Sequence, residues 1–378
     1  MKLRHALRDL LGALALSGAL AMSAQAQPLP TGALQAALAA AVASPDTRFQ
    51  AAVLAVHRPG EPIWSGAAGT AELASGTPLT PDARFRAGSI AKPFVATVTL
   101  QLVEEGALAL DAPITTLLPP EVTDRFPQAS RVSVRMLLQH TGGIPEWIDG
   151  TVIDRIGRDP GRIWNVDEFL DLAAAKTPPF EPGHGWAYAN TDYNLLGLII
   201  ERATGTSWRE QVRQRIVEPL GLASTSLPEP GATAIVAPVM HGYGMVDGQL
   251  VDLTASDPSM AGAAGGSALV TTTTDLITFL DALRTAELFQ DASTLTAMTT
   301  FVDARNPGGQ TGYGLGLERY VFPGGFEAIG HSGSSPGYFA FVGYLPDLDV
   351  TIALAVDAML DPTPVLVAAI TALTPQDR

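Results

Sequence analysis

Ser89 and Lys92 are the two residues whose types and spacing most directly indicate chemistry. They lie in segment 85–94, which Pro93 and the apolar residues after it predict to begin a helix. Residues three apart share a helix face, so the Lys92 amine can reach the Ser89 hydroxyl. Free N–H groups at the start of a helix also favour negative charge developing near Ser89. This pair is therefore a candidate nucleophile and base.

Lysine is rare in this chain, which strengthens the pattern. The 23 lysines and arginines include only three lysines, at positions 2, 92 and 176. Arginine cannot deprotonate, whereas a lysine removed from water can act as a base. A Ser-x-x-Lys pattern also arises by chance, but the amine is kept here where catalysis would need it. We therefore favour the catalytic interpretation.

Tyr188 and Asn190 form a second candidate pair. Residues two apart in an extended segment face the same side, so both side chains could address one cleft. Tyr188 could relay a proton, and Asn190 could bind an amide of the substrate. In the structural alternative, Tyr188 packs in the core and Asn190 caps a helix that begins near Asp192.

A third group comprises His331, Ser332, Gly333 and Ser334, shortly before an alternating strand pattern at 338–345. A strand with such donors could bind a substrate backbone in the manner of an added β-strand. Gly333 would allow close approach of the two backbones. We therefore interpret this segment as substrate-binding.

Three other interpretations are less favoured. Residues 333–337 match Gly-x-Ser-x-Gly, but the nucleophile elbow needs a following helix and a later histidine, and His331 is the last histidine. His140 ends a predicted helix, so it is expected to have a structural role as part of a C-terminal cap. The chain has no cysteine and no His-x-x-x-His pair, so we expect no metal and no other cofactor.

The predicted scaffold is α/β and forms one domain over residues 27–378. We expect an antiparallel sheet of about five strands drawn from both chain ends, flanked by terminal helices, with a large and mostly helical insertion. The sheet lobe would comprise about residues 27–88 and 304–378, and the helical lobe about 89–303. The expected strands lie at 50–57, 63–68, 313–320, 338–345 and 350–357.

Residues 1–26 have the features of a secretory signal. Three cations precede the apolar run 10–22, and small residues precede a cleavage point after Ala26. We therefore expect a periplasmic or secreted protein. No later stretch is long and uncharged enough for a stable membrane span. The net charge of −15 argues against nucleic acid as a partner.

In this order, the Ser-x-x-Lys, Tyr-x-Asn and His-x-Gly motifs resemble the three active-site motifs of the penicillin-recognising serine hydrolases. That superfamily includes class C β-lactamases, secreted D-alanyl-D-alanine carboxypeptidases, D-aminopeptidases and esterases. The resemblance covers nearly the whole chain after residue 26. It extends to framing segments at 137–143, 218–221, 273–276 and 312–317.

The resemblance implies a β-lactamase/transpeptidase-like fold and an acyl-enzyme mechanism. Ser89 would attack a carbonyl, and Lys92 would act as base or proton relay. Tyr188 would take part in transferring the proton to the leaving group. Backbone N–H groups of Ser89 and Ser334 would form the oxyanion hole. Water would then release the acyl group. The substrate would be bound by Asn190, His331, Ser332, Gly333 and Ser334.

The sequence indicates the substrate less clearly than the catalytic residues. Class C β-lactamases usually have lysine where this chain has His331, so the sequence is more like the carboxypeptidases and D-aminopeptidases. Glu318 and Arg319 point to opposite faces of a predicted strand. Arg319 in the cleft would favour a substrate carboxylate, whereas Glu318 there would favour an amine or a neutral ester.

Our leading expectation is a D-alanyl-D-alanine carboxypeptidase acting on D-amino-acid peptides such as peptidoglycan stem peptides. An esterase, a D-aminopeptidase or a β-lactamase on the same scaffold is the alternative. From a different class of protein, a penicillin-binding sensor would acylate with little turnover. Oligomeric state does not follow from the sequence.

Overall fold

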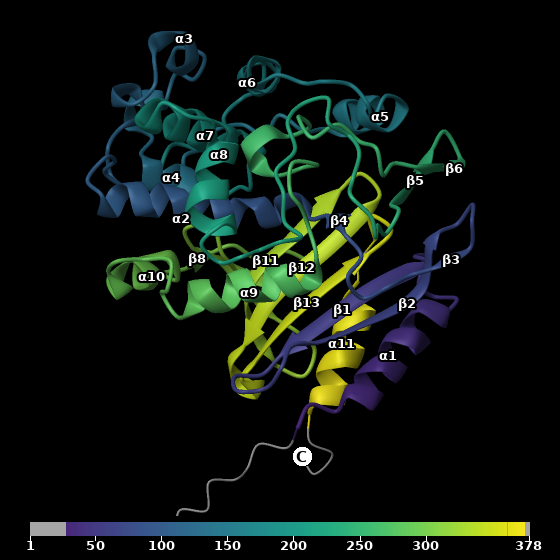
Figure 1. Ribbon diagram of the computed structural model, residues 1–378. Helices are drawn as coiled ribbons and strands as arrows, with labels where there is room; N and C mark the ends of the chain where they lie inside the picture. Colours follow the sequence, from purple (N-terminus) through teal and green to yellow (C-terminus); the bar gives the residue numbers. More distant parts are fainter. Residues whose placement is uncertain (1–27, 361, 375–378) are drawn as a thin grey trace, which may run out of the picture.

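The computed structural model describes residues 28–360 and 362–374 (Figure 1). The predicted signal sequence and its cleavage point lie outside this part of the chain. The main sheet is antiparallel, in the order β3-β2-β1-β13-β12-β11-β10-β9-β8. Its strands are β1 (Ala51–His57), β2 (Trp64–Glu72), β3 (Thr77–Pro78), β8 (Val302–Asp303), β9 (Gln310–Tyr313), β10 (Glu318–Val321), β11 (Glu327–Ser335), β12 (Tyr338–Leu345) and β13 (Val350–Val356).

The α/β class, the antiparallel sheet from both chain ends and the helical insertion are as predicted, but the strand count is not. We expected about five strands, and the main sheet has nine. The predicted strand at 313–320 is two strands, because the chain turns at Gly316, where φ is +87°. β3 and β8 have two residues each, too few for a periodic pattern. β11 contains Gly330, Gly333 and several serines, which are not typical strand formers.

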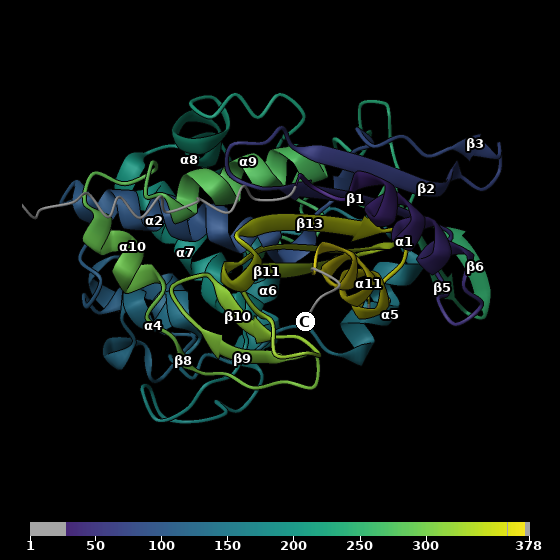
Figure 2. The same ribbon diagram turned by 90° about the horizontal axis from the view of Figure 1, so that it is seen from below.

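Each face of the sheet is covered by helices. Val53 and Ala55 of β1 belong to the core on the side of α9 (Thr273–Arg284), whereas Leu54 belongs to a second core on the opposite face. This alternation is the period of two expected for a strand with both faces buried. Figure 2 shows α9 on one side of the sheet and the terminal helices α1 (Thr31–Ala43) and α11 (Thr363–Leu373) on the other.

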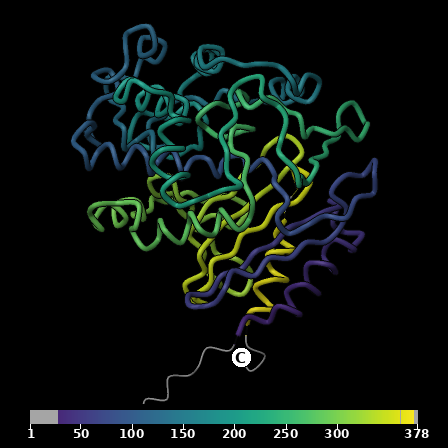
Figure 3. The backbone as a smooth tube through the Cα atoms, viewed as in Figure 1, coloured from purple at the N-terminus to yellow at the C-terminus, as the bar shows by residue number. Residues whose placement is uncertain are grey.

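The two ends of the described chain lie next to each other. α1 and α11 pack side by side, and Figure 3 shows the purple and yellow ends of the trace running together along the sheet. Strand β1, from the N-terminal part, pairs with β13, from the C-terminal part. This pairing places strands from both ends of the chain in one sheet. β11, which belongs to that sheet, therefore lies next to the start of the helical lobe.

The helical lobe follows the first strands and lies at the top of Figure 1. The Phe94 ring of α2 (Ala91–Glu104) stacks on Phe279 of α9 with ring centroids 3.7 Å apart, which connects this lobe to the sheet. None of the described helices is long and apolar enough to span a membrane. The helices of the lobe are α2 (Ala91–Glu104), α3 (Pro120–Thr123), α4 (Val134–Gln139), α5 (Gly150–Arg158), α6 (Val166–Ala174), α7 (Asn190–Thr204), α8 (Trp208–Val212) and α10 (Ala292–Met298).

Short strands and turns complete the lobe. β4 (Phe85–Arg86) pairs with β7 (Val270–Thr271), and β5 (Tyr243–Val246) forms a hairpin with β6 (Gln249–Asp252). Two 3₁₀ turns, at Gly88–Ile90 and Gly262–Ala264, lie close to the start of α2.

Candidate active site

Ser89 lies in the 3₁₀ turn between β4 and α2, at the junction of the two lobes. Its two neighbours, Gly88 and Ile90, are buried, whereas Ser89 is partly exposed. Gly88 has φ +59°, a conformation that a residue with a side chain rarely adopts. The turn therefore presents one hydroxyl to solvent at the beginning of a helix, as the sequence predicted.

The Lys92 side chain is completely buried beneath Ser89. Its amine lies 3.1 Å from Ser89 Oγ and donates to Asn190 Oδ1 at 2.8 Å. It also donates to the backbone oxygen of Ala264 at 2.7 Å. These three partners match the three N–H groups of an ammonium, and they fix the amine next to the hydroxyl.

Burial lowers the pKa of Lys92 to about 7, because the charged amine is removed from water. The carboxyl groups of Glu146, Glu318 and Asp192 act in the opposite direction and keep the pKa from falling further. A large part of the Lys92 population can therefore be neutral near pH 7, and a neutral lysine is able to take a proton from Ser89.

This pKa predicts a pH dependence. Only neutral Lys92 can act as the base, so kcat/KM for acylation should rise as pH increases through about 7 and level off above it. The measurement is kcat/KM for an activated ester between about pH 5 and 9, corrected for spontaneous hydrolysis. A profile that stays flat through neutrality would contradict a Lys92 base.

Tyr188 lies against the same amine. Lys92 Nζ is 4.6 Å from the centre of the Tyr188 ring and 3.1 Å from Ser89 Oγ, so the ring and the hydroxyl both lie next to one amine. Burial raises the pKa of Tyr188 well above its usual value, so the phenol keeps its proton at neutral pH. It is placed to pass a proton between Ser89 and a leaving group.

Asn190 is the first residue of α7, so this helix begins two residues earlier than expected. The suggestion that Asn190 caps the helix is wrong, because the N-cap position is Ala189 and the Asn190 side chain bonds Lys92 and Glu146 instead. It bridges Lys92, through Oδ1, and Glu146, to which Nδ2 donates at 3.0 Å. The structure thus brings Ser89, Lys92, Tyr188 and Asn190 together.

Glu146 was not foreseen. One of its carboxyl oxygens accepts from the backbone N–H of Asn190 at 2.6 Å, and the other accepts from Ile148 at 2.7 Å. Burial raises its pKa, while the nearby Lys92 lowers it. A single glutamate in a loop belongs to no periodic pattern, so the sequence did not indicate its role. The Ala264 carbonyl could not be predicted either, because every residue has a backbone carbonyl. Both act on Lys92 or its partner Asn190.

Gly333 allows β11 to contact the nucleophile turn. A Cβ on Gly333 would lie 1.9 Å from the Ala87 oxygen and 3.0 Å from the Ser89 nitrogen. Ser332 N donates to Glu318 Oε2 at 2.7 Å, so its N–H points away from β12. With a strand period of two, the Ser334 N–H faces the same edge. A Cβ on Gly88 would lie 2.6 Å from the Ser334 nitrogen, so the backbone of Ser334 lies close to the turn that carries Ser89.

A Gly333→Ala variant should lower kcat by about 10²- to 10³-fold, because the added methyl group separates β11 from the Ser89 turn and removes one oxyanion donor. The measurement is kcat on an activated ester, together with the melting temperature. Gly150→Ala is the control, since its Cβ would meet nothing within 4 Å. Equal kcat for the two variants would contradict the close-approach role of Gly333.

His331 is fully buried. Its Nδ1 donates to the Ser332 carbonyl at 2.5 Å, which leaves Nε2 to accept from the Tyr313 hydroxyl at 3.0 Å. Burial lowers the pKa of His331, which favours the neutral ring. The ring therefore acts as a donor within the protein, and the exposed polar groups at the Gly333 end of this strand are Ser334 and, in part, Ser332. Tyr313 is a further site residue that the sequence did not single out.

His140 ends α4 in the left-handed conformation, with φ +59°, as its predicted role in a helix cap requires. It has a second role that the sequence did not indicate. Its Nδ1 lies 2.8 Å from Asp192 Oδ2, and its ring centre lies 4.6 Å from that of Tyr188. Burial lowers the pKa of His140 and raises that of Asp192, because both groups are removed from water.

The structure settles which residue of β10 faces the interior. Glu318 is 3% exposed, bonds the Tyr320 hydroxyl as well as Ser332 N, and lies 3.6 Å from His331 Nδ1. The Arg319 side chain is 38% exposed and faces Glu327 and the Phe301 ring. The buried residue at the start of β10 therefore carries a carboxyl group, next to Ser332 and His331 of β11. Within the described residues, no group of three or more His, Asp or Glu side chains could hold a metal ion.

Comparisons with known proteins place these residues in context. The family model described as Beta-lactamase matches residues 33–373. The chain is 32% identical over 301 residues to esterase EstB of Burkholderia gladioli, covering 71% of this chain and 75% of EstB. It is 30% identical over 319 residues to penicillin-binding protein 4 of Amycolatopsis lactamdurans, covering 80% and 79% of the two chains.

Solved structures give a similar result. A D-stereospecific amidohydrolase from Streptomyces sp. superposes with a TM-score of 0.80 at 32% identity, covering 90% of this chain and 98% of the other. The D-amino acid amidase from Ochrobactrum anthropi SV3, in complex with D-phenylalanine, superposes with a TM-score of 0.78 at 28% identity, covering 91% and 99%.

Proposed function

This chain belongs to the beta-lactamase family and is a serine hydrolase, and we propose that it cleaves amides of D-amino acids that carry a free amine, through an acyl-enzyme on Ser89. The single observation that carries the choice of substrate is the orientation of β10. Its interior residue is Glu318, not Arg319. A carboxyl group at this place attracts an ammonium and disfavours a second carboxylate.

Other features support the same substrate class. The carboxyl group of Glu318 raises the pKa of Lys92, so its charge acts at the position of the catalytic amine. Two structural relatives have names that specify D-configured amides or amidohydrolase activity. A D-alanyl-D-alanine carboxypeptidase, which the sequence favoured, would need a cation or several donors for the terminal carboxylate. With His331 neutral and Arg319 turned outward, only the serine hydroxyls of β11 are left for that purpose.

Ester cleavage is a second candidate, favoured by the match to esterase EstB over 71% of this chain. The acyl-enzyme chemistry is the same for both substrates. An alcohol or phenol leaves more readily than an amine, so an ester depends less on proton delivery by Tyr188.

In the proposed reaction, neutral Lys92 takes the proton from Ser89 Oγ as the oxygen bonds to the substrate carbonyl carbon. The N–H groups of Ser89 and Ser334 stabilise the oxyanion. Tyr188 passes a proton to the amide nitrogen and takes the proton that Lys92 received from Ser89, so Lys92 is neutral again as the C–N bond breaks and ammonia or an amine leaves. Water then attacks the acyl carbon and gives a proton to Lys92. Lys92 returns this proton to Ser89 Oγ as the ester bond breaks and the D-amino acid leaves.

Substrate choice can be tested with a matched pair of variants on one strand. Glu318→Gln should lower kcat/KM for D-phenylalanine amide relative to p-nitrophenyl acetate by about threefold to tenfold, because the negative charge is lost. Arg319→Gln, which alters the outward side chain, should leave this ratio unchanged. N-acetyl-D-Ala-D-Ala should be a poorer substrate than D-phenylalanine amide for the unmodified enzyme. A preference for N-acetyl-D-Ala-D-Ala, or an unchanged ratio in Glu318→Gln, would overturn the proposed substrate class.

We also propose that the protein is exported, to the periplasm or the medium, because of the signal features in residues 1–26. The test is N-terminal sequencing of the protein recovered outside the cytoplasm. The expected first residue is Gln27. Recovery of the full chain, starting at Met1, from the cytoplasm alone would contradict export.

A further inference from the structure

Asn190 presents its carbonyl oxygen, and not its amide nitrogen, to the catalytic lysine. Asn190 Oδ1 accepts from Lys92 Nζ at 2.8 Å. The amide nitrogen Nδ2 faces the other way and donates to Glu146 Oε2 at 3.0 Å. The same carboxyl oxygen accepts from the backbone N–H of Asn190 at 2.6 Å. Glu146 therefore holds the carboxamide by its nitrogen end, which leaves the oxygen end for Lys92.

This orientation matters because of the way in which a neutral lysine uses its atoms. A neutral amine has two N–H groups and one lone pair, and it needs the lone pair to take a proton from Ser89. The carbonyl oxygens of Asn190 and Ala264 accept from Lys92 Nζ at 2.8 and 2.7 Å. With both N–H groups used there, the lone pair is left for Ser89 Oγ, which lies 3.1 Å from Nζ. A flipped carboxamide would instead donate its own N–H to the lone pair and block the base.

The hydrogen bonds of Glu146 favour a carboxylate. Its Oε1 accepts from the backbone N–H of Ile148 at 2.7 Å, and its Oε2 accepts from both nitrogens of Asn190. All three partners are donors, whereas a protonated carboxyl would need an acceptor for its proton. Burial raises the pKa of Glu146, whereas these hydrogen bonds and the charge of Lys92 lower it. A negative charge is thereby held near the catalytic amine.

The loop that carries Glu146 is itself tied to its surroundings. Thr191 Oγ1 donates to the Pro145 oxygen at 2.6 Å, which joins the loop to the start of α7. The Lys176 amine donates to the backbone oxygens of Glu146 and Trp147 at 2.9 and 3.0 Å. The carboxyl group is therefore presented to Asn190 from a fixed backbone.

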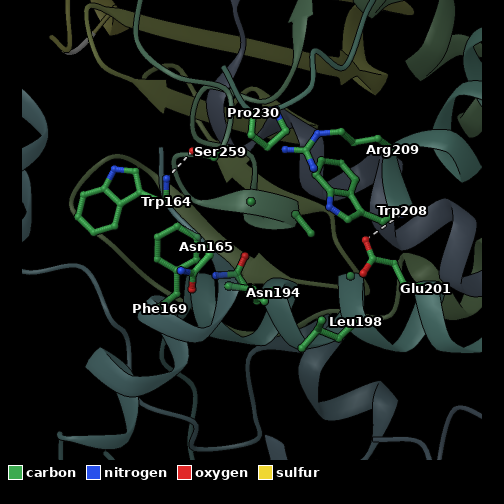
Figure 4. Close-up of a pocket in the computed structure, with 14 residues that line it drawn as sticks. Trp164, Asn165, Phe169, Asn194, Leu198, Glu201, Trp208, Arg209, Pro230 and Ser259 are labelled. Atoms are coloured by element: carbon green, nitrogen blue, oxygen red, sulfur yellow. Dashed lines mark hydrogen bonds between the residues drawn. The ribbon is translucent and has the colours of Figure 1, made fainter. Parts of the chain in front are cut away.

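The later turns of α7 have a different environment. Figure 4 shows them with Asn194 and Glu201 among the residues that line a cavity of about 260 Å³. Asn190 lies at the start of the helix, and its side chain has two hydrogen-bond partners among the described residues, Lys92 and Glu146. Because Lys92 can either donate to this carboxamide or accept from it, Glu146 decides which end the amine meets.

We propose that Glu146 is a positioning residue for acyl transfer: it fixes the Asn190 carboxamide so that the lone pair of Lys92 is kept for Ser89, and it holds a negative charge near that amine. This role rests on the proposed acyl-enzyme reaction with Lys92 as the base. Glu146 acts in two ways, through Asn190 and through its charge, and substitutions can separate the two.

Other titratable groups also face the Lys92 amine. Burial is the main influence on the pKa of Lys92 and lowers it, and Glu146 is the strongest of the carboxyl groups that raise it. The remaining groups are Glu318 of β10, Asp192 and Tyr193 of α7, Tyr188, His140 at the end of α4, and His331 of β11. The charge of Glu146 also raises the pKa of Tyr188 and of Asp192. All these groups are present in every Glu146 variant, so a difference between the variants reports on position 146.

The test is the pH profile of kcat/KM for p-nitrophenyl acetate in two variants. In Glu146→Gln, Lys92 loses its proton at lower pH, so the rise near pH 7 should move down by about one pH unit. Glutamine can present either end of its own amide to Asn190, so the plateau at high pH should also fall by about tenfold or more. Glu146→Asp keeps the charge but is one methylene shorter. Its plateau should fall while the rise stays near pH 7.

A control variant and a second background complete the experiment. Glu121→Gln removes an exposed carboxyl group of the same lobe and should leave the plateau and the position of the rise unchanged. In an Asn190→Ala background, Glu146→Gln should lower the plateau by less than about twofold further, because the carboxamide is already absent. Melting temperatures are measured in parallel, and Glu146→Asp tests the orientation by itself if Glu146→Gln does not fold.

The outcomes separate this role from the reaction on which it rests. A flat profile for the unmodified enzyme would contradict Lys92 as the base, and the role of Glu146 would fall with it. A rise near pH 7 in the unmodified enzyme, with the same position and height in Glu146→Gln, would overturn the role of Glu146 alone. An equal loss from Glu146→Gln with and without the Asn190 carboxamide would overturn it as well.

Discussion

Replacing Lys92 by arginine should lower kcat/KM by about 10²- to 10⁴-fold, the range usually lost with a general base. Arginine keeps the positive charge but does not deprotonate at neutral pH, so it cannot take the proton of Ser89. The larger guanidinium also has no room among the Ser89, Asn190 and Ala264 oxygens, since the Lys92 side chain is completely buried. The measurement is kcat/KM for p-nitrophenyl acetate and for D-phenylalanine amide at several pH values.

The matched control is Lys176→Arg. Lys176 is partly exposed, forms an ion pair with Asp149 at 3.0 Å and donates to two backbone oxygens, all of which arginine can also do. This control should stay within about twofold of the unmodified enzyme, as surface substitutions usually do. A Lys92→Arg variant as active as the control would show that no neutral amine is needed at position 92.

Replacing Ser89 by alanine should reduce kcat by about 10⁴-fold or more, because no other group can then form the covalent intermediate. The fold should survive, since Ser89 is partly exposed and its hydroxyl bonds the Lys92 amine, which keeps its bonds to Asn190 and Ala264 in the variant. Activity and melting temperature are compared with those of Ser130→Ala, a change at an exposed serine in another part of the helical lobe. Substantial activity in Ser89→Ala, beyond that of a mock preparation, would remove the proposed mechanism.

Much of the fold was predictable from the sequence because its strongest signals are periodic. The alternation and apolar runs around Val53 and Leu54 identify β1, and the same pattern identifies β12 and β13. Residues 331–334 were interpreted as a substrate-binding strand, but β11 is absent from the expected strands of the sheet, because glycine and serine are poor strand formers. Gly333 instead allows the strand to approach the Ser89 turn. The backbone pairing of β11 with β12 outweighs the low strand propensity of these residues.

Residues of the candidate site that belong to short sequence motifs could be predicted. Residues that join the site only through contacts between distant segments could not. Ser89, Lys92, Tyr188 and Asn190 meet as their spacing suggested. Glu146 contributes through a single loop carboxyl, for which no spacing rule exists. The choice between Glu318 and Arg319 depends on the register of β10 against β9 and β11, which a short strand does not reveal.

The central claim is that hydrolysis proceeds through an acyl group on Ser89, and rapid-quench mass spectrometry tests it most directly. The enzyme is mixed with p-nitrophenyl acetate, quenched in acid during the first turnover, and mapped by tandem mass spectrometry of its peptides. We expect a burst of p-nitrophenol stoichiometric with enzyme and an acetyl group on Ser89, both absent from Ser89→Ala. An acetyl group on another residue of the unmodified enzyme, together with an undiminished burst in Ser89→Ala, would contradict the account.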